Sequence, residues 1–170
     1  MEDILAKALQ FTDKYQIVGR AHYLAADHYA RLNRLLGIPV IIITALVGTT
    51  IFSTLEQNPN SWLKIIAGLV SLVGTVFAAL QTSLGYAQTA EKHKTAGETY
   101  RSVQRRFEIF ELKFKLAGPD NRETAMNKLE DLVEKLEEVA KNFPTVSDKY
   151  YNIAKRELQT RIASHEHLKA

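Results

Sequence analysis

Two histidines and two tyrosines are the side chains whose types and spacing are best suited to chemistry. In the stretch AEKHKTAGETY, His93 precedes Tyr100 by seven residues. Nearer the N-terminus, His22 precedes Tyr29 by the same interval. An imidazole titrates near neutral pH and can bind a metal ion, and a phenol hydroxyl donates and accepts hydrogen bonds. The pattern therefore indicates a ligand pair, a catalytic pair or a set of contacts that joins two packed helices.

Heptad periodicity favours the third interpretation. Apolar and aromatic residues, with the histidines among them, recur every seven positions in two interleaved series on each side of the hydrophobic middle of the chain. On the N-terminal side the series contain Ile4, Phe11, Val18, Ala25 and Leu32, with Ala8, Tyr15, His22, Tyr29 and Leu36. On the C-terminal side they contain Tyr86, His93, Tyr100, Phe107 and Phe114, with Thr89, Ala96, Val103 and Phe110. These series predict two long helices that pack against each other.

An antiparallel alignment of the two helices pairs the polar members. His22 then lies opposite Tyr100, and Tyr29 lies opposite His93. The same alignment pairs the neighbouring residues, namely Phe11 with Phe110 and Tyr15 with Phe107. A buried imidazole needs a partner, and a hydrogen bond from a phenol hydroxyl would contribute about 1 kcal/mol. We call His22, Tyr29, His93 and Tyr100 the polar ladder and predict that it fixes the register of the helices.

Other chemistry at the polar ladder is less well supported. A pH switch stays open as an alternative, because histidine titrates near neutrality. A metal site would need three or four converging ligands, and no carboxylate joins the histidines on the heptad series. The chain has no cysteine, which excludes disulfides, thiolate catalysis and sulfur-ligated zinc. No nucleophile and base are placed for catalysis, so we expect neither enzyme activity nor a cofactor.

Charged residues are absent from one long stretch and nearly absent from a second. Residues 35–55 contain none, and residues 62–84 contain Lys64 as the single charge. At about 1.5 Å per residue, a helix of about 20 residues spans a hydrocarbon core of about 30 Å. The sequence therefore predicts two transmembrane helices, although two buried core helices of a soluble protein would have a similar composition.

Basic residues near the two spans set the expected orientation. Arg31 and Arg34 precede the first span, lysines and arginines follow the second, and the connecting loop EQNPNS carries none. Because basic residues stay on the cytoplasmic side, we expect both termini in the cytoplasm and the loop outside, with Trp62 at the outer interface. The net charge of +3 is too small to indicate nucleic-acid binding.

The predicted elements form one all-α unit over residues 1–170. They are an N-terminal stalk helix (3–36), a first span (37–55), an outer loop (56–61), a second span (62–84), a second stalk helix (85–117) and a cytoplasmic helical hairpin (120–165). The second helix is expected to run unbroken from about residue 62 to residue 116, and the hairpin to begin at a capping box of Asp120 and Glu123. We thus expect a two-span transmembrane hairpin that continues into a cytoplasmic stalk and four-helix bundle, assembled as a homo-oligomer.

Small and hydroxyl-bearing residues gather on one side of the second span. At about 100° per residue they fall within a sector of roughly 120°, with bulky residues on the other side. The candidates for pore lining or helix packing are Gly68, Ser71, Gly74, Thr75, Ala78, Gln81 and Thr82, together with Thr44 and Gly48 in the first span. Because small residues let helices approach closely in lipid, they indicate either packing against the first span or the lining of a narrow pore between subunits. No acidic residue, arginine or histidine lies mid-span, which argues against a proton-coupled pump or a voltage sensor.

Three stretches resemble the SLATT family of two-span proteins, which are associated with SMODS nucleotidyltransferases and SLOG sensors in bacterial conflict systems. They are RAHYLAADHYARLNRLLGIP (20–39), AEKHKTAGETYRSVQRRFE (90–108) and FPTVSDKYYNIAKREL (143–158). The resemblance implies an effector in the bacterial inner membrane that forms pores when a separately encoded nucleotide-signalling or sensor partner signals infection. The sequence shows no glycine-rich phosphate loop of its own, so the trigger is expected from a partner or from the membrane lipid.

An oligomeric pore-forming or channel-like membrane protein is therefore the leading functional hypothesis. Two spans cannot enclose a water path, so ion passage requires several copies of the chain around an axis. Gating would act through the cytoplasmic helices. The alternative is a membrane-anchored scaffold whose hairpin docks a cytoplasmic partner without conducting ions.

Overall fold

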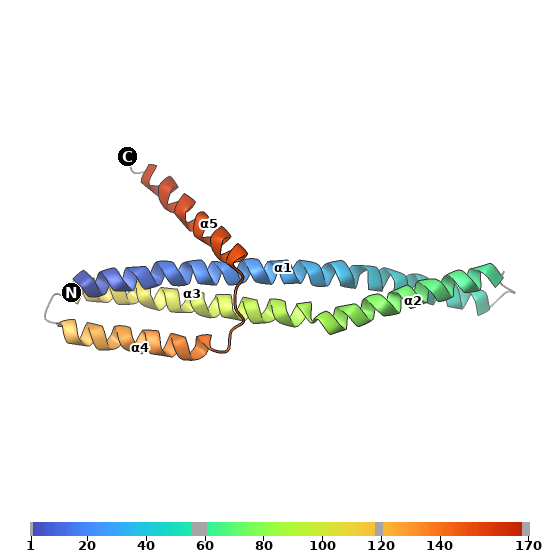
Figure 1. The fold of residues 1–170 in the computed structure, drawn as a ribbon, viewed down its shortest axis with the longest axis horizontal. Coiled ribbons are helices and arrows are strands. Elements are labelled where there is room, and N and C mark those ends of the chain that lie inside the picture. The colour runs from blue at the N-terminus through green and yellow to red at the C-terminus, as the bar shows by residue number, and fades with distance from the viewer. Residues whose placement is uncertain (1, 56–60, 118–120, 168–170) are drawn as a thin grey trace. The chain divides into compact units, whose positions relative to one another are not determined.

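The computed structural model describes residues 2–55, 61–117 and 121–167 (Figure 1). The helices are α1 (Glu2–Leu55), α2 (Ser61–Leu84), α3 (Tyr86–Ala117), α4 (Arg122–Ala140) and α5 (Asp148–His167). These residues contain no strand, so the predicted all-α fold is confirmed. Most of the expected outer loop and the expected capping residue Asp120 lie outside the described residues.

The chain divides into two compact units. One comprises Met1–Asp27 with Glu91–Ala170, and we call it the bundle unit. The other is His28–Ala90, which holds both hydrophobic stretches, and we call it the span unit. Helix α1 contributes to both units as one continuous helix, which passes Gly37 and Pro39 without interruption.

Two helical segments, one in α1 and one that starts in α2, are long and apolar enough to cross a membrane. Only 6% of the most apolar stretch of each segment is buried. A core helix of a soluble protein would be mostly buried, whereas large side chains such as Ile41 and Leu72 are 70% and 62% exposed. These exposures favour the transmembrane interpretation over buried core helices, because lipid tails are as apolar as these side chains and their exposure to lipid carries no free-energy penalty.

Gly85 separates α2 from α3, so the prediction of one unbroken helix from residue 62 to residue 116 is wrong. Its φ is +56°, a conformation that glycine adopts without the clash that a Cβ would cause. The Gly85 carbonyl accepts hydrogen bonds from the backbone N–H and the hydroxyl of Thr89, at 3.0 and 3.1 Å. The chain therefore leaves α2 at a defined left-handed residue and begins a new helix immediately.

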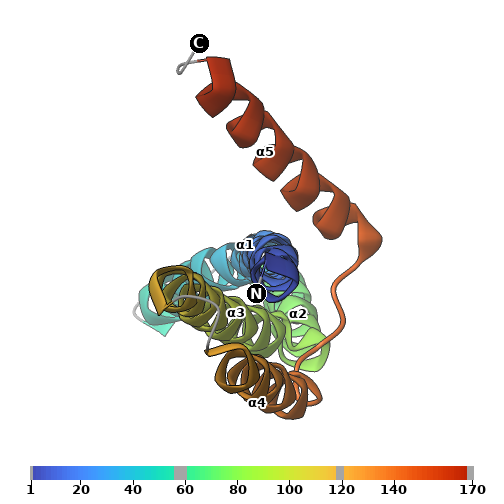
Figure 2. The same ribbon diagram turned by 90° about the vertical axis from the view of Figure 1, so that its left-hand side faces the viewer.

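A hydrophobic core joins three helices of the bundle unit. Helix α1 supplies Ile4, Ala8 and Tyr15, α3 supplies Phe107, Phe110 and Phe114, and α4 supplies Ala125, Leu129 and Leu136. Helix α4 lies along α3 in both views (Figures 1 and 2). The apolar residues of α4 recur at spacings of three, four and seven, which directs one side of that helix to the core.

Helix α5 joins the bundle unit by a mixture of apolar and polar contacts. Ala154 and Leu158 are buried, and the guanidinium of Arg20 on α1 binds the carboxylate of Glu157 at 2.7 Å. The segment between α4 and α5 carries Phe143, whose ring reaches the pair of helices α1 and α3. The connection between α4 and α5 thus also takes part in packing.

Candidate functional site

His22 of α1 and His93 of α3 form a buried pair in the bundle unit. Their Nδ1 atoms are 3.0 Å apart, and the two residues are 3% and 4% exposed. The ring of Tyr100 stacks on His22 with centroids 5.4 Å apart, and Phe143 contacts both His22 and Tyr100. The site therefore combines α1, α3 and the segment that leads into α5.

The hydrogen bond of His22 differs from the prediction. The expected donor was the Tyr100 hydroxyl, but Tyr100 contacts His22 through its ring face, and the bond joins His22 to His93. Knob-into-hole packing explains the difference, because a residue of one helix sits between two residues of the facing helix that are a heptad apart. His22 lies between Tyr100 and His93, which are seven residues apart, so both contacts form.

The aromatic neighbours of the histidine pair follow the same rule. Tyr15 contacts Phe107 at 5.5 Å, as predicted, and also Tyr100 at 6.0 Å between ring centroids. Phe11 contacts Phe107 at 5.6 Å, one turn away from the Phe110 expected from one-to-one pairing. One-to-one alignment thus identifies the facing residues but omits the second neighbour of each ring.

Two glycines bring α1 and α3 close together one turn from the histidines. A Cβ placed on Gly97 would lie 3.2 Å from the Gly19 carbonyl oxygen and 3.2 Å from ring carbons of Tyr23. A Cβ on Gly19 would lie 3.2 Å from the Cβ of Tyr100. This close crossing lies one turn from the point where the rings of His93 and Tyr100 both contact His22.

Burial decides the protonation of the pair. It lowers the pKa of His22 to about 4, with the nearby His93 adding to the effect, and it also lowers the pKa of His93. Both imidazoles are therefore neutral at pH 7. In a hydrogen bond between them, the Nδ1–H of one ring donates and the unprotonated Nδ1 of the other ring accepts. Within the part of the chain that the structure describes, no three His, Cys, Asp or Glu residues come together to hold a metal ion.

The fourth member of the polar ladder, Tyr29, belongs to the span unit. Its ring packs against Tyr86 with centroids 6.0 Å apart. Its expected pairing with His93 joins residues of different compact units and stays a prediction.

The small-residue side of α2 divides into two parts. One part packs on α1: a Cβ on Gly74 would lie 2.7 Å from Cγ2 of Ile43, and a Cβ on Gly37 would lie 2.9 Å from Nε2 of Gln81. Gly74 is buried, and Ala78 beside it is half-buried. These residues allow the close approach of the two span helices.

The other part of this side is exposed in the single chain. It comprises the hydroxyl residues Ser71, Thr75 and Thr82, together with Gly68, where a Cβ would meet no neighbour within 4 Å. Thr75 and Thr82 donate their hydroxyl protons to carbonyls one turn earlier in α2, at 2.9 and 3.1 Å. In α1, Thr44 does the same toward Val40 at 2.7 Å, and a Cβ on Gly48 would also meet open space.

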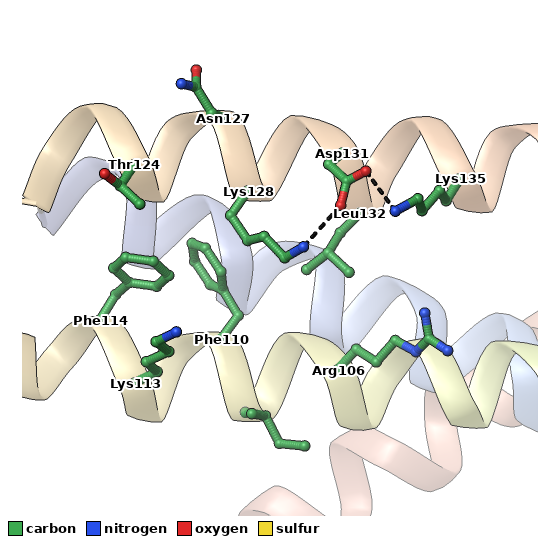
Figure 3. A pocket seen from close by; sticks show the side chains of 11 residues that line it. Arg106, Phe110, Lys113, Phe114, Thr124, Asn127, Lys128, Asp131, Leu132 and Lys135 are labelled. Atoms are coloured by element: carbon green, nitrogen blue, oxygen red, sulfur yellow. Dashed lines mark hydrogen bonds and ion pairs between the residues drawn. The ribbon is translucent and has the colours of Figure 1, made fainter.

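A basic groove between α3 and α4 was not predicted from the sequence. Figure 3 shows its lining, and its volume is about 640 Å³. Basic side chains line it (Arg106, Lys113, Lys128 and Lys135), core residues form its floor (Phe110, Phe114 and Leu132), and the exposed Ile109 also lines it. The signal lay in the sequence, because each helix contributes two basic residues that are seven positions apart and therefore share one side of that helix.

Comparison with known protein families shows that the family described as SMODS and SLOG-associating 2TM effector domain family 4 matches residues 13–165. No curated protein and no solved structure matches the chain significantly.

Proposed function

The chain belongs to the SMODS and SLOG-associating 2TM effector domains, family 4, and from this premise we propose that it is an oligomeric, pore-forming or channel-like membrane protein. It would act as an effector of a bacterial conflict (anti-phage) system in the inner membrane, with both termini in the cytoplasm. The trigger would come from a separately encoded nucleotide-signalling or sensor partner, as the family description suggests. We expect no catalytic activity of its own.

The exposed hydroxyl residues of α2 carry this proposal. In a membrane, bulky apolar side chains face lipid without a free-energy penalty, whereas small residues let a neighbouring helix approach closely. A helix surface of small residues is therefore expected to face protein or water. Ser71 and Thr75 are exposed in the single chain, and the buried contact of Gly74 with α1 lies on an adjacent part of the helix. Neighbouring copies of the chain would cover this surface or line a water path with it.

Helix continuity supports gating through the bundle unit. Helix α1 passes from the bundle unit into the span unit without a break, so a movement of its N-terminal half would be transmitted to its membrane half. The second connection is interrupted at Gly85. A glycine at positive φ lets the direction of α2 change relative to α3, so α2 would follow a movement of α1 without a bend in α3.

Ion release from liposomes tests the proposal. The purified full-length chain, reconstituted in vesicles of bacterial lipids, is expected to release potassium or a small dye, and Thr75→Leu is expected to change the rate. Val76→Leu is the matched control, because it enlarges the adjacent residue on the bulky side of α2. Vesicles that stay tight at every lipid composition and pH tested, with the partner protein present, would contradict pore formation.

A membrane-anchored scaffold is the second candidate, because the bundle unit has its own hydrophobic core and the family is described as associating with other components. A scaffold would bind the partner protein and leave the vesicles tight. Co-sedimentation of the partner with the same proteoliposomes measures this binding independently of ion release. Binding without release under all conditions would favour the scaffold.

A further inference from the structure

The groove between α3 and α4 offers a positively charged surface with an apolar floor. Among the described residues that line it, Asp131 is the one acidic residue, and this carboxylate already binds Lys128 at 3.0 Å and Lys135 at 2.7 Å. Arg106 and Lys113 on α3 add further positive charge (Figure 3). Beside them on α3, Ile109 also lines the groove and is 64% exposed. The groove therefore suits an occupant that carries negative charge beside apolar groups.

Helix α4 carries the complementary charge on its other flank. The exposed glutamates Glu123, Glu130, Glu134 and Glu137 recur at spacings of seven, four and three. At about 100° per residue they fall within a sector of roughly 60°, on the opposite side of the core-facing stripe from Lys128 and Lys135. Glu137 lies near enough to Tyr15 of α1 to help burial raise the pKa of that tyrosine. Glu137, at one edge of the acidic flank, thus lies on the α1 side of α4, whereas the basic groove borders α3.

We propose that the acidic flank of α4 in one copy of the chain docks into the basic groove of the next copy. The two surfaces lie on different sides of the same subunit, so the contact is heterologous and repeats around an axis until a ring closes. This interface rests on the proposed pore function, which requires several copies around one axis. It specifies which cytoplasmic surfaces hold the copies together.

The positions of the charges along α4 support a ring whose symmetry axis is parallel to α4. In such a ring, rotation places each residue of the neighbouring copy at the same height as the equivalent residue of the first copy. Glu130 and Glu134 of the neighbour then lie at heights between Lys128 and Lys135, which are about 10 Å apart at 1.5 Å per residue. Opposite charges therefore meet without a shift along the helix.

The position of the α3 residues extends this match. At one end of the groove Phe114 lies near Thr124, and at the other end Arg106 lies near Lys135 (Figure 3). Arg106 is therefore at about the height of Glu134, and Lys113 lies nearer the height of Asn127. A glutamate row of this spacing on a neighbouring helix would meet cations from both walls of the groove.

Apolar surface on both sides would be buried together with the charges. Met126 is 44% exposed beside the acidic flank, and Ile109 is exposed where it lines the groove. Burial of apolar area drives most protein association, whereas complementary charge selects the partner and the register. A second copy of the chain supplies both features, and a small anion would leave the floor uncovered.

Charge reversal tests the interface on the full-length chain in detergent. Glu130→Lys with Glu134→Lys, or Arg106→Glu with Lys113→Glu, is expected to reduce the assembly to single chains in light scattering coupled to size exclusion. The four substitutions together restore opposite charges and are expected to recover the wild-type mass. Circular dichroism checks that each variant keeps its helix content.

Matched variants separate a specific contact from net charge. Arg105 and Lys115 are exposed on the same helix but do not line the groove. Reversal of both to glutamate is expected to leave the assembly intact, and to give no rescue when it is combined with the Glu130 and Glu134 reversals. Rescue by this pair, or a wild-type mass after either groove reversal, would overturn the proposal.

Cysteine crosslinking gives a second measurement, because the natural chain has no cysteine. Oxidation of a chain with Glu134→Cys and Arg106→Cys is expected to give covalent multimers, and the pair with Arg105→Cys in place of Arg106→Cys is expected to give few. Equal yields from the two pairs would contradict the docking. Binding of inorganic pyrophosphate that Arg106→Glu abolishes, with the assembly unchanged, would instead assign the groove to a small anion.

The interface and the pore can fail separately. Assembly that follows the charge reversals, in vesicles that stay tight, would support the interface and contradict the pore. Ion release from a protein whose assembly is unchanged by the charge reversals would support the pore and contradict the interface.

Discussion

The bundle unit and the span unit pair antiparallel helices in different ways. In the bundle unit, α1 and α3 cross closely at Gly19 and Gly97 but also meet through large rings, of which Phe107 is fully buried in contact with Phe11 and Tyr15. In the described side chains of the span unit, Gly74 is the one buried residue, and it meets Ile43. The large apolar residues of that unit point outward instead.

The solvent explains this difference. In water, a helix pair is stabilised by removing large apolar surface from the solvent, so the largest side chains lie inside. In lipid, that driving force is absent, and close contact between backbones through small residues holds the helices together. One chain thus shows both kinds of helix packing, so the effects of substitutions in the two units can be compared directly.

The largest difference is expected for truncation of a large apolar side chain. Phe107→Ala should lower the free energy of unfolding of the bundle unit by about 3–5 kcal/mol, because it removes a fully buried ring and leaves a cavity. Leu72→Ala in α2, where the side chain is 62% exposed, should change stability by about 0.5 kcal/mol or less. Thermal unfolding in detergent, with hydrogen exchange to resolve the two units, measures both. Equal losses of stability from Phe107→Ala and Leu72→Ala would contradict the view that the bundle unit packs in water and the span unit packs in lipid.

Acid should destabilise the bundle unit selectively. The folded pKa of His22 is about 4, below the value of about 6.5 expected in the unfolded chain, so the unfolded state binds more protons between these values. Stability should therefore fall as the pH falls through this window, by about 2 kcal/mol from His22 between pH 7 and pH 5. His93 adds to the effect in the same direction, because burial also lowers its pKa.

Hydrogen exchange at pH 7 and pH 5 measures the acid effect by unit. Peptides from α1 and α3 around the histidine pair should lose protection, and peptides from α2 should not. A variant with both histidines replaced by phenylalanine should lose most of the pH dependence. A pH dependence that survives in this variant would assign it to other groups.

The opposite sensitivity is expected for small residues in the span unit. Gly74→Ala places a methyl group 2.7 Å from Cγ2 of Ile43 and should destabilise the α1–α2 pair by roughly 1–2 kcal/mol, because the helices or the isoleucine must shift. Gly68→Ala on the same helix meets open space and should have little effect or stabilise the helix slightly. Unfolding in mixed micelles of increasing sodium dodecyl sulfate compares the two. A loss for Gly68→Ala that equals the loss for Gly74→Ala would contradict the role of the Gly74–Ile43 contact, because the higher helix propensity of alanine can only stabilise the helix.

Periodicity predicted much of this fold but only part of the candidate site. The heptad series identified the facing sides of α1 and α3, including the contact of Tyr15 with Phe107, because burial repeats with the helix. The bond between His22 and His93 was missed, since a linear alignment assigns one partner to each residue. The groove between α3 and α4 was missed because it depends on how far two helices stand apart, which periodicity does not give.

The break at Gly85 was missed for a different reason. A glycine inside an apolar helical pattern is tolerated as a helical residue, and only its φ of +56° shows that it ends α2. Gly85→Ala should cost about 1 kcal/mol if the left-handed conformation is kept. The alternative for the chain is to join α2 and α3 into one helix, which should alter ion release if α2 moves during gating. Liposome release and helix content measured on this variant distinguish a strained residue 85 from a single joined helix. If neither quantity changed, the break at residue 85 would not matter for ion release.

The smallest effect is expected at the polar contact that ties α5 to the bundle unit. Arg20 and Glu157 form a short ion pair, but both side chains are about two-fifths exposed, so water and salt screen the attraction. Glu157→Gln should lower stability by about 0.5 kcal/mol or less at low salt, and the difference should vanish at about 1 M salt. The proximity of the two groups raises the pKa of Arg20 and lowers the pKa of Glu157, so the pair stays charged across neutral pH. Hydrogen exchange of the α5 backbone at both salt concentrations checks this. A loss as large as that of Phe107→Ala would mean that a surface charge, rather than aromatic packing, holds this unit together in water.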